Sequence, residues 1–366
     1  MKHSIQSAAF STPGRICLFG EHQDYLGLPV IPCAISLRIT LSGSRRTDRE
    51  VYLDLPDIHS HEVFSLQGVL PYVKERDYFR STVNVMRKHG YTFSSGFDCV
   101  VRGTIPINSG TSSSSALIVT WINFLATMSD QADQLSPDVI ARYAHEAEVL
   151  EFGEPGGMMD HFSTAIGGVI FLEFSPAVRV ETMEPKLGTF VLGDSMEPKD
   201  TKSILSRVKD QVIAVSNKLA AVHPGFSLQH TSVEEIKHYA AELTAEQREL
   251  LIGTLTNRDI TMRAKTMLME KELNHRAIGT LLSEHQKILR DTLKISTPKI
   301  DRMLSAATDA GAYGGKINGS GGGGCMFAYA PDDPNAVADA IRSVGGKAYV
   351  VMTENGTRRE LLESGL

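Results

Sequence analysis

The sequence predicts a protein of the α+β class with two domains. The chain has 366 residues, which exceeds the size at which a single hydrophobic core stops growing. Strand-like apolar runs and helix-like segments are mixed in both halves, without the regular alternation of a doubly wound sheet. We place the boundary near Pro185, which gives an N-terminal domain over 1–185 and a C-terminal domain over 186–366.

Composition and charge restrict the class of partner. Hydrophobic residues make up 42% and charged residues 22% of the chain, as in an ordinary soluble protein. The net charge of −6 argues against a nucleic-acid binder. The net charge does not exclude small acidic ligands such as ATP, because the electric field at the binding site, rather than the net charge, decides whether they bind. No sequence feature fixes the oligomeric state, and a monomer is the expectation.

The sequence also predicts a cytoplasmic location without a membrane partner. The N-terminal stretch has no apolar core long enough for a signal peptide, and no apolar run reaches the length of a membrane span. The four cysteines, at positions 17, 33, 99 and 325, form no CxxC pair. This spacing predicts neither a disulfide framework nor a zinc site, so a reducing compartment is expected.

Two apolar runs near the N-terminus, 16–19 and 30–41, have the character of strands. The loop between them carries four polar or ionisable residues: Glu21, His22, Asp24 and Tyr25. Loops held by rigid strands often carry function. A charged hairpin tip is the structural alternative for this loop taken alone.

The next segments alternate between strand and helix patterns. Residues 42–75 have the pattern of β-hairpins with polar turns, and 78–88 is predicted to be a helix that ends at His89-Gly90. Residues 97–103 are predicted to form a strand, and 117–128 an apolar helix.

A loop of small residues, PINSGTSSSSA at 106–116, joins this strand to this helix. Such an arrangement binds phosphate, because the loop and first-turn N–H groups are unpaired and the helix dipole places partial positive charge there. Gly and Ser also let the backbone approach a ligand closely. The loop is not a Walker A sequence, since no Lys follows a Gly at the required place. The alternative is a Ser-rich surface turn with one Ser as the helix N-cap.

An acidic residue lies on the following predicted helix. Ser136-Pro137 has the order of an N-cap and a first helical residue. Glu148 falls at the edge of the apolar stripe of the helix that begins there. Its carboxylate either reaches solvent or coordinates a ligand.

A second acidic residue, Asp160, lies between a glycine-containing turn at 153–160 and an apolar strand at 168–174. Taken alone, an Asp in such a place is usually the N-cap of a short helix, here one that starts near His161.

The second half begins near Pro185 and contains most of the predicted helices. Strands are predicted at 189–192, 326–330 and 348–352, and helices at 201–221, at several places within 233–310, and at 335–344.

Five of the six residues from Gly319 to Gly324 are glycine. Their spacing matches GxGxxG, but the segment runs into a strand rather than a helix, so a Rossmann site is excluded. Because glycine is entropically costly to order, we expect this segment to approach a ligand or another loop closely.

Three stretches, in this order along the chain, resemble the motifs of the GHMP kinase superfamily, which includes galactokinase and mevalonate kinase. They are PGRICLFGEHQDYLG at 13–27, INSGTSSSSA at 107–116 and KINGSGGGGC at 316–325. The first looks most like galactokinase, whose loop carries Gly-Glu-His-x-Asp-Tyr after Pro-Gly-Arg. Gly157-Met158-Met159-Asp160 is similar to the Gly-Ile-Met-Asp of the same family, and residues 283–291 loosely resemble its Ser-His-x-Ser-Leu-Arg-Asp.

The chain departs from the galactokinase pattern at three places. His161 stands where galactokinases carry Gln, the glycines of the second motif are thinned at 108–111, and Ser296-Thr297-Pro298 is more similar to mevalonate kinase. These departures bear on the identity of the substrate more than on the reaction.

The resemblance implies a fold as well as an activity. The N-terminal domain would be ribosomal-protein-S5-like, with a mixed sheet and a left-handed βαβ crossover. The C-terminal domain would be ferredoxin-like, and the active site would lie in the cleft between them.

The implied activity is transfer of the γ-phosphoryl group of MgATP to a hydroxyl, here the anomeric 1-hydroxyl of a sugar such as galactose. By resemblance, Asp160 and Arg15 are the catalytic pair, and Ser114 and Glu148 bind Mg²⁺. The residues implied to bind the sugar are Glu21, His22, Asp24 and Gly157. Those implied to bind ATP are Ser109, Gly110, Thr111, Ser112, Ser113, Ser114 and Ser115.

Two other functions stay open. One is a GHMP kinase that acts on mevalonate, on a different sugar or on a uronic acid. The other is a protein that senses sugar and ATP without catalysis, although a sensor has no need for a base at Asp160.

Overall fold

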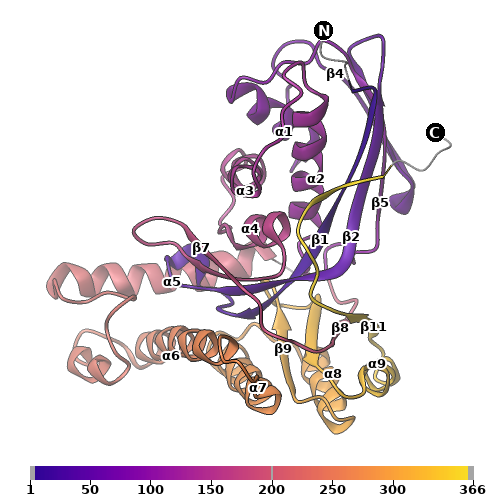
Figure 1. Cartoon of the computed structure of the whole chain (residues 1–366). Coiled ribbons are helices and arrows are strands. Elements are labelled where there is room, and N and C mark those ends of the chain that lie inside the picture. Colours follow the sequence, from indigo (N-terminus) through magenta and orange to yellow (C-terminus); the bar gives the residue numbers. More distant parts are fainter. Residues whose placement is uncertain (1–4, 199–200, 362–366) are drawn as a thin grey trace.

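The computed structural model describes residues 5–198 and 201–361. These residues form an upper body around an eight-stranded sheet and a lower body around a four-stranded sheet (Figure 1). The long strands β1 (Ser7–Phe19) and β2 (Ile31–Arg45) run down from the upper body to the junction between the two (Figure 1).

The larger sheet has the strand order β12-β1-β2-β5-β3-β4, with β6 paired to β2 and β7 paired to β6. Its further strands are β3 (Glu50–Leu55), β4 (Ser60–Ser65), β5 (Phe97–Gly103), β6 (Val169–Glu173), β7 (Arg179–Met183) and β12 (Arg358–Glu360). Strands β3 and β5 are parallel whereas the other pairs are antiparallel, so the sheet is mixed, as the resemblance implied.

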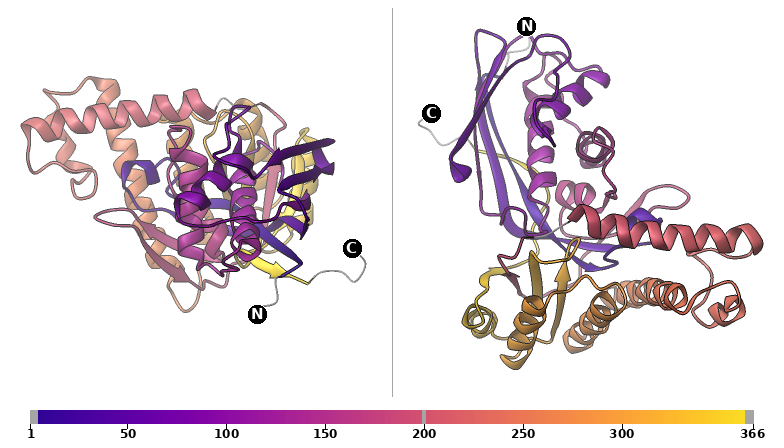
Figure 2. Two further views of the ribbon diagram at one scale, coloured as in Figure 1. Left: turned by 90° about the horizontal axis from the view of Figure 1, so that it is seen from above. Right: turned by 180° about the vertical axis from the view of Figure 1, so that it is seen from behind.

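Four helices cover one face of this sheet, as two further views show (Figure 2). They are α1 (Tyr78–Lys88), α2 (Ser113–Met128), α3 (Pro137–His145) and α4 (Met159–Ile166). Helix α2 is buried along most of its length because its sequence is apolar on nearly every side. Trp121 and Phe124 stack on each other and meet Phe97 of β5 edge to face, which anchors the helix on the sheet.

The lower body is ferredoxin-like, as expected. Its antiparallel sheet has the order β11-β8-β10-β9. The strands are β8 (Phe190–Asp194), β9 (Gly314–Asn318), β10 (Cys325–Tyr329) and β11 (Lys347–Val351). The helices are α6 (Ala245–Leu268), α7 (His275–Asp291), α8 (Pro298–Asp309) and α9 (Pro334–Ser343).

Helix α5 (Thr201–Val222) extends from the junction of the two bodies to one side of the molecule (Figure 1). It packs on α6, and short turns at η1 (Asp24–Leu26) and η4 (Glu234–Tyr239) join the same apolar cluster. The remaining short elements are the 3-10 turn η2 (Pro56–Ile58) and the π turn η3 (Glu146–Leu150).

The predicted elements are present, with three corrections. Helix α2 begins at Ser113 rather than at residue 117, so the serine run forms its first turn. Asp160 is not an N-cap, because α4 begins at Met159 and Met158 takes the capping position. The sequence pattern also missed three strands: β7 (Arg179–Met183), β9 (Gly314–Asn318) and β12 (Arg358–Glu360).

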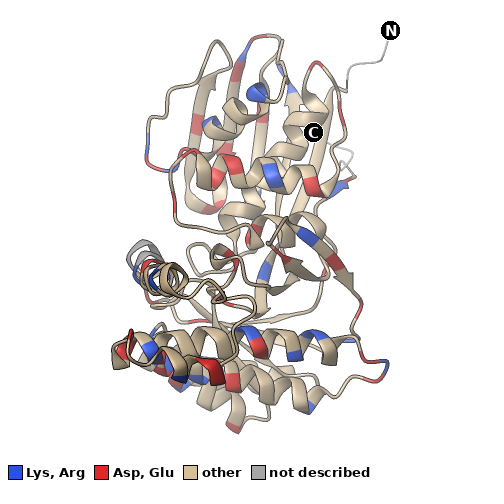
Figure 3. Cartoon of the chain, turned by 90° about the vertical axis from the view of Figure 1, so that its left-hand side faces the viewer, with Lys and Arg blue, Asp and Glu red and all other residues tan. Residues whose placement is uncertain are grey.

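Charged residues of both signs lie along the helices. In the view of Figure 3, acidic and basic residues are interspersed along the helices rather than gathered on one side. None of the helices within the described residues is long and apolar enough to cross a membrane.

Candidate active site

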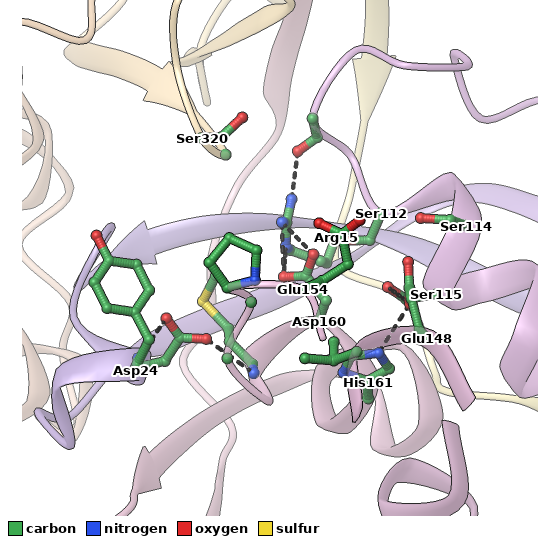
Figure 4. Close-up of a pocket in the computed structure, with 18 of the residues that line it drawn as sticks. Arg15, Asp24, Ser112, Ser114, Ser115, Glu148, Glu154, Asp160, His161 and Ser320 are labelled. Atoms are coloured by element: carbon green, nitrogen blue, oxygen red, sulfur yellow. Dashed lines mark hydrogen bonds and ion pairs between the residues drawn. The ribbon is translucent and has the colours of Figure 1, made fainter. Parts of the chain in front are cut away.

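A cavity of about 220 Å³ lies where the two bodies meet, and its walls come from chain segments that are far apart in sequence (Figure 4). The lining includes nearly all of the catalytic and ligand-binding residues that the resemblance implies. These are Arg15, Glu21, His22, Asp24, Gly110, Ser112, Ser113, Ser114, Ser115, Glu148, Gly157 and Asp160. The motif residues therefore share one site.

Arg15 and Asp160 form a two-pronged ion pair. Arg15 Nε donates to Asp160 Oδ1 at 2.8 Å and Nη2 donates to Oδ2 at 2.8 Å. The Arg15 side chain is 4% exposed, whereas that of Asp160 is 31% exposed, so the carboxylate faces the cavity. Burial is the largest influence and would raise the pKa of Asp160, but the charges of Arg15 and His161 and the hydrogen bonds of Ser112 and Arg15 together hold it below its usual value.

Strand β1 is irregular on both sides of Arg15. Its pairing with β2 shifts register between Pro13 and Gly14 and again between Cys17 and Phe19. Such bulges re-aim side chains. Arg15 is still in register with Ala34 of β2, and its N–H donates to the carbonyl of Thr111 at 3.1 Å, which joins the strand to the small-residue loop.

The Gly110 carbonyl in this loop is a shared acceptor. Arg15 Nη1 donates to it, and so does the Asn318 amide of β9, at 2.8 Å. Gly110 has a φ of +89°, and a Cβ added there would lie 2.8 Å from the Asn318 carbonyl oxygen. Gly319 approaches from the other side, where an added Cβ would lie 2.9 Å from the Gly110 oxygen. The predicted close approach of the glycine-rich segment to another loop is thus confirmed.

Two of the loop residues implied to bind ATP, Ser109 and Thr111, are not among the residues that line the cavity. The hydroxyl of Ser109 donates to the Pro106 carbonyl at 2.7 Å, and the Thr111 hydroxyl lies 3.3 Å from that of Ser109. Both residues are buried. They shape the loop from inside, while Ser112 to Ser115 line the cavity.

Glu148 is held inside the molecule by three polar neighbours. Its Oε2 accepts from Ser115 Oγ at 2.7 Å and from His161 Nε2 at 2.8 Å. Burial would raise the pKa of Glu148, but hydrogen bonds from His161, Ser114 and Ser115 keep it below its usual value. The side chain is 12% exposed, so the solvent-reaching alternative is wrong.

Asp24 lies on the opposite side of the cavity, on η1 (Figure 4). Its Oδ1 accepts from the Tyr25 N–H at 2.9 Å and its Oδ2 from the Met159 N–H at 3.3 Å. A Cβ at Gly157 would overlap this carboxylate, so any larger residue there would displace Asp24 from its present position. Burial, and then the nearby charge of Asp160, raise the pKa of Asp24 to about 6.

His22 is fixed by both ring nitrogens. Nε2 lies 3.1 Å from the Ser320 carbonyl, which only accepts, so Nε2 carries the hydrogen. Nδ1 then accepts from the Tyr25 hydroxyl at 2.6 Å. Burial lowers the pKa of His22, which favours this neutral tautomer. The loop therefore contacts the glycine-rich segment of the lower body.

Glu21 makes a second contact of this kind. Its carboxylate binds Lys316 Nζ of β9 at 2.5 Å and the Gly319 N–H at 2.7 Å. The side chains are 2% and 0% exposed for Glu21 and Lys316, respectively. The predicted ligand loop is thus held in place by the lower body.

A second cavity, of about 300 Å³, adjoins the first. Its wall is largely apolar, with Ile39, Leu55, Val101, Ile105 and Leu117 among the lining residues. Five residues line both cavities: Arg76, Tyr78, Asn108, Ser113 and Ser114.

Sequence reasoning missed four residues of the site: Arg76, His161 as a partner of Glu148, Lys316 and Asn318. Lys316 and Asn318 belong to a quoted motif, but only the fold shows that they cross to the other body. Arg76 lies in a turn with a φ of +56° and carried no motif signal.

No group of three or more His, Cys, Asp or Glu side chains that could hold a metal ion occurs among the residues that the structure describes. Ser114 and Glu148 nevertheless both line the cavity, and the Ser114 hydroxyl contributes to lowering the pKa of Glu148. Oxygen ligands of this number fit Mg²⁺, which takes its other ligands from phosphate and water.

Three family models match the chain, and together they cover more than half of it. The "GHMP kinases N terminal domain" matches residues 77–168 and "GHMP kinases C terminal" matches 269–347. The "Galactokinase galactose-binding signature" matches residues 2–45, which include Arg15 and the loop from Glu21 to Asp24.

Relatives with two different substrates are similar to the chain. The mevalonate kinase of Pyrococcus furiosus is 28% identical over 353 residues, covering 93% of this chain and 94% of the relative. The galactokinase of Actinobacillus succinogenes is 28% identical over 356 residues, covering 92% and 88%.

Solved structures show the same fold. The galactokinase of Lactococcus lactis, complexed with galactose, superposes with a TM-score of 0.85 at 22% identity, covering 97% of this chain and 95% of that one. The mevalonate kinase of Methanococcus jannaschii gives a TM-score of 0.74 at 18% identity, with coverage of 96% and 100%. The chain therefore belongs to the GHMP kinase superfamily and is a galactokinase-like kinase.

Proposed function

We propose that this kinase transfers the γ-phosphoryl group of ATP to the anomeric 1-hydroxyl of a sugar, and that the sugar is galactose. One observation carries the proposal. The galactose-binding signature at residues 2–45 contains the loop with His22 and Asp24, and that loop lines the same cavity as Asp160.

The charges of the cavity favour a neutral polyol over a carboxylate substrate. Among the residues that the structure describes, five acidic side chains line it: Glu21, Asp24, Glu148, Glu154 and Asp160. The two guanidinium groups in the lining are already engaged, Arg15 with Asp160 and Arg76 with Glu154 at 3.1 Å. Mevalonate or a uronic acid would bring a further negative charge, which these carboxylates repel. Sugar hydroxyls instead donate to them.

Asp160 is proposed to accept the proton of the attacking hydroxyl. Its ionised state is stabilised by Arg15, and its exposed edge faces the cavity. Arg15 also offsets the negative charge that builds on the attacking oxygen. Such a reaction depends on positioning and charge neutralisation more than on covalent chemistry.

The two adjoining cavities suit the two ends of ATP. The apolar cavity fits the adenine ring, and the five shared residues mark where the phosphates pass into the polar cavity. There the N–H groups at the start of α2, with the hydroxyls of Ser112 to Ser115, are the proposed phosphate ligands. Ser109, Gly110 and Thr111 hold the loop in shape, since their contacts lie on its inner side.

Mg²⁺ is part of this proposal, with Ser114 and Glu148 as its protein ligands. When bound, the ion would neutralise phosphate charge and orient the terminal phosphoryl group. The chain's own contribution is two adjacent oxygen ligands, one of them an ionised carboxylate held by hydrogen bonds.

The proposed sugar contacts are Asp24, His22, Glu21 and the backbone at Gly157. The carboxylates of Asp24 and Glu21 keep free lone pairs beyond their present hydrogen bonds. Charge-assisted hydrogen bonds of this kind orient a polyol and reject analogues that lack a hydroxyl.

A cytoplasmic location and a monomeric state belong to the proposal as well. The cysteines at positions 17, 33 and 99 are buried free thiols, which supports a reducing compartment.

The test is a substrate panel. Purified protein is incubated with ATP, Mg²⁺ and, in turn, galactose, glucose, galacturonate and mevalonate, and the products are identified by ³¹P NMR. We expect galactose 1-phosphate. Turnover of mevalonate alone would contradict the sugar assignment. Calorimetric binding of galactose and ATP with no sugar phosphate after long incubation would instead indicate a sensor.

A further inference from the structure

His161 follows Asp160 directly on α4, but its side chain is directed at Glu148 (Figure 4). The imidazole is 2% exposed, and its Nε2 lies 2.8 Å from Glu148 Oε2. An ionised carboxylate only accepts hydrogen bonds, so Nε2 carries the hydrogen and donates it. The other ring nitrogen, Nδ1, is buried and has no hydrogen-bond partner among the described residues. The ring thus makes one polar contact, and that contact is to Glu148.

We propose that His161 is a positioning residue that fixes the Glu148 carboxylate for the Mg²⁺ of MgATP. This inference rests on the proposed metal role of Glu148. The chain departs here from the galactokinase pattern, in which Gln occupies this position. Gln and His both offer an N–H donor at the end of the side chain, so the donor is the shared chemical property.

Two side-chain donors contact the same oxygen of the Glu148 carboxylate. His161 and Ser115 both bind Oε2, at 2.8 Å and 2.7 Å. Two donors on one oxygen fix the plane of the carboxylate, and Oε1 keeps its capacity to ligate a cation at the cavity wall.

The ring of His161 is itself held in place. His145, at the end of α3, packs against it edge to face, with ring centroids 5.3 Å apart and planes at 81°. The π turn η3 (Glu146–Leu150) follows directly, and Glu148 is its middle residue. His161 therefore joins α4, which carries Asp160, to the turn that carries the proposed metal ligand.

The affinity of the protein for a divalent metal ion distinguishes a positioning role of His161 from a purely structural one. Mn²⁺ is used as the probe, and its binding is measured by electron paramagnetic resonance in the presence of a non-hydrolysable ATP analogue and galactose. This readout requires no turnover. Thermal unfolding and the calorimetric affinity for galactose without metal are measured in parallel, so that a loss of fold is recognised directly.

Two variants remove the donor, and one keeps it. His161→Phe retains an aromatic ring, and His161→Asn retains a polar side chain too short to reach Glu148. We expect both to weaken Mn²⁺ binding by about tenfold, the lower end of the range for partners of metal ligands, without changing the galactose affinity. His161→Gln should stay close to the parent protein, because its amide nitrogen reaches about as far as Nε2. If the Phe variant fails to fold, the Asn variant carries the comparison.

His145→Phe is the matched control. It keeps a ring against His161 and removes no hydrogen bond to Glu148, so Mn²⁺ affinity should be unchanged. The inference is overturned if His161→Asn binds Mn²⁺ as tightly as the parent. It is also overturned if Glu148→Gln leaves Mn²⁺ affinity unchanged. Either result leaves phosphorylation of galactose by the parent protein untouched, so failure of this inference is distinct from failure of the sugar-kinase proposal.

Discussion

Lys316 of the lower body and Glu21 of the upper body form an ion pair that is almost completely removed from water. Their charged atoms are 2.5 Å apart, and the side chains are 0% and 2% exposed. The pair holds the loop that begins at Glu21 against strand β9. The shape of the proposed sugar site therefore depends on both bodies.

Replacing Lys316 by Met is expected to lower the free energy of unfolding by about 3–5 kcal/mol, because Glu21 is left as a buried charge without a partner. The measurement is urea unfolding followed by circular dichroism. Combining it with Glu21→Gln removes the unpaired charge and should recover most of the loss. A single variant as stable as the parent protein would show that the pair contributes nothing to stability.

Asp160→Asn should lower kcat by about 10²–10⁴-fold, the usual contribution of a general base. The substitution keeps the shape of the side chain but cannot accept a proton. Galactose and ATP affinities, measured by calorimetry, should stay close to those of the parent. Near-normal turnover would remove Asp160 from the role of base.

Sugar affinity should rise with pH through the pKa of Asp24, which burial and then the charge of Asp160 raise to about 6. Sugar hydroxyls donate to the ionised form, so the KM for galactose should fall as the pH increases from about 5 to about 7. The pKa of His22 is lowered by burial, so that ring favours its neutral form more than a free imidazole does.

The stability contribution of Asp24 has the opposite sign. Its folded pKa of about 6 lies above the ordinary value of 3.8, so the folded protein binds the proton more tightly than the unfolded chain. That contribution is present below the ordinary value and is lost as the pH rises through about 6. Asp24→Asn should remove both dependences; a KM that still falls over the same range would contradict the assignment.

Gly157→Ala should abolish or strongly weaken galactose binding while ATP still binds. The added Cβ would overlap Asp24 Oδ2 and push the carboxylate away from its present position. A displacement of about 1 Å can reduce activity by about 10²-fold. Gly156→Ala is the matched control, because its Cβ would meet only Val149, at 3.4 Å. The two variants are compared by galactose titration; equal effects would mean that the overlap with Asp24 is not the cause.

Local patterns predicted most of the elements. Helix α1 (Tyr78–Lys88) and strand β5 (Phe97–Gly103) begin and end where their periodicity and flanking residues indicated. The helix after the serine loop was also present, but it begins four residues earlier than expected, at Ser113. Serine favours caps in isolated peptides, whereas here the packing of α2 in the core draws the serines into the first turn.

The environment of Glu148 could not be predicted from a regular helix. A period of 3.6 residues places it at the edge of an apolar stripe, but the chain forms a π turn at Glu146–Leu150. One extra residue per turn changes which side chains face inward. His161, which completes its surroundings, lies on another helix and contributes no local signal.

The contacts between the two bodies could not be predicted from sequence patterns either. The glycines around Gly319 indicated a close approach, but not that its partner would be Gly110. Lys316 and Asn318 lie two residues apart on β9. Lys316 contacts the loop that begins at Glu21, and Asn318 contacts the small-residue loop at Gly110. Only the three-dimensional arrangement reveals such long-range pairs.

The last strand of the upper sheet has a consequence for the way the protein is made. Strand β12 (Arg358–Glu360) pairs with Ala9, Phe10 and Ser11 of β1, and the Arg38 guanidinium binds the carbonyls of Asn355 and Gly356. Segments 9–11 and 358–360, far apart in sequence, thus meet beside Arg15 on β1. During translation, this edge of the sheet stays uncovered until residues 358–360 have left the ribosome, so a chain that stops before them exposes the backbone of β1 to misassociation.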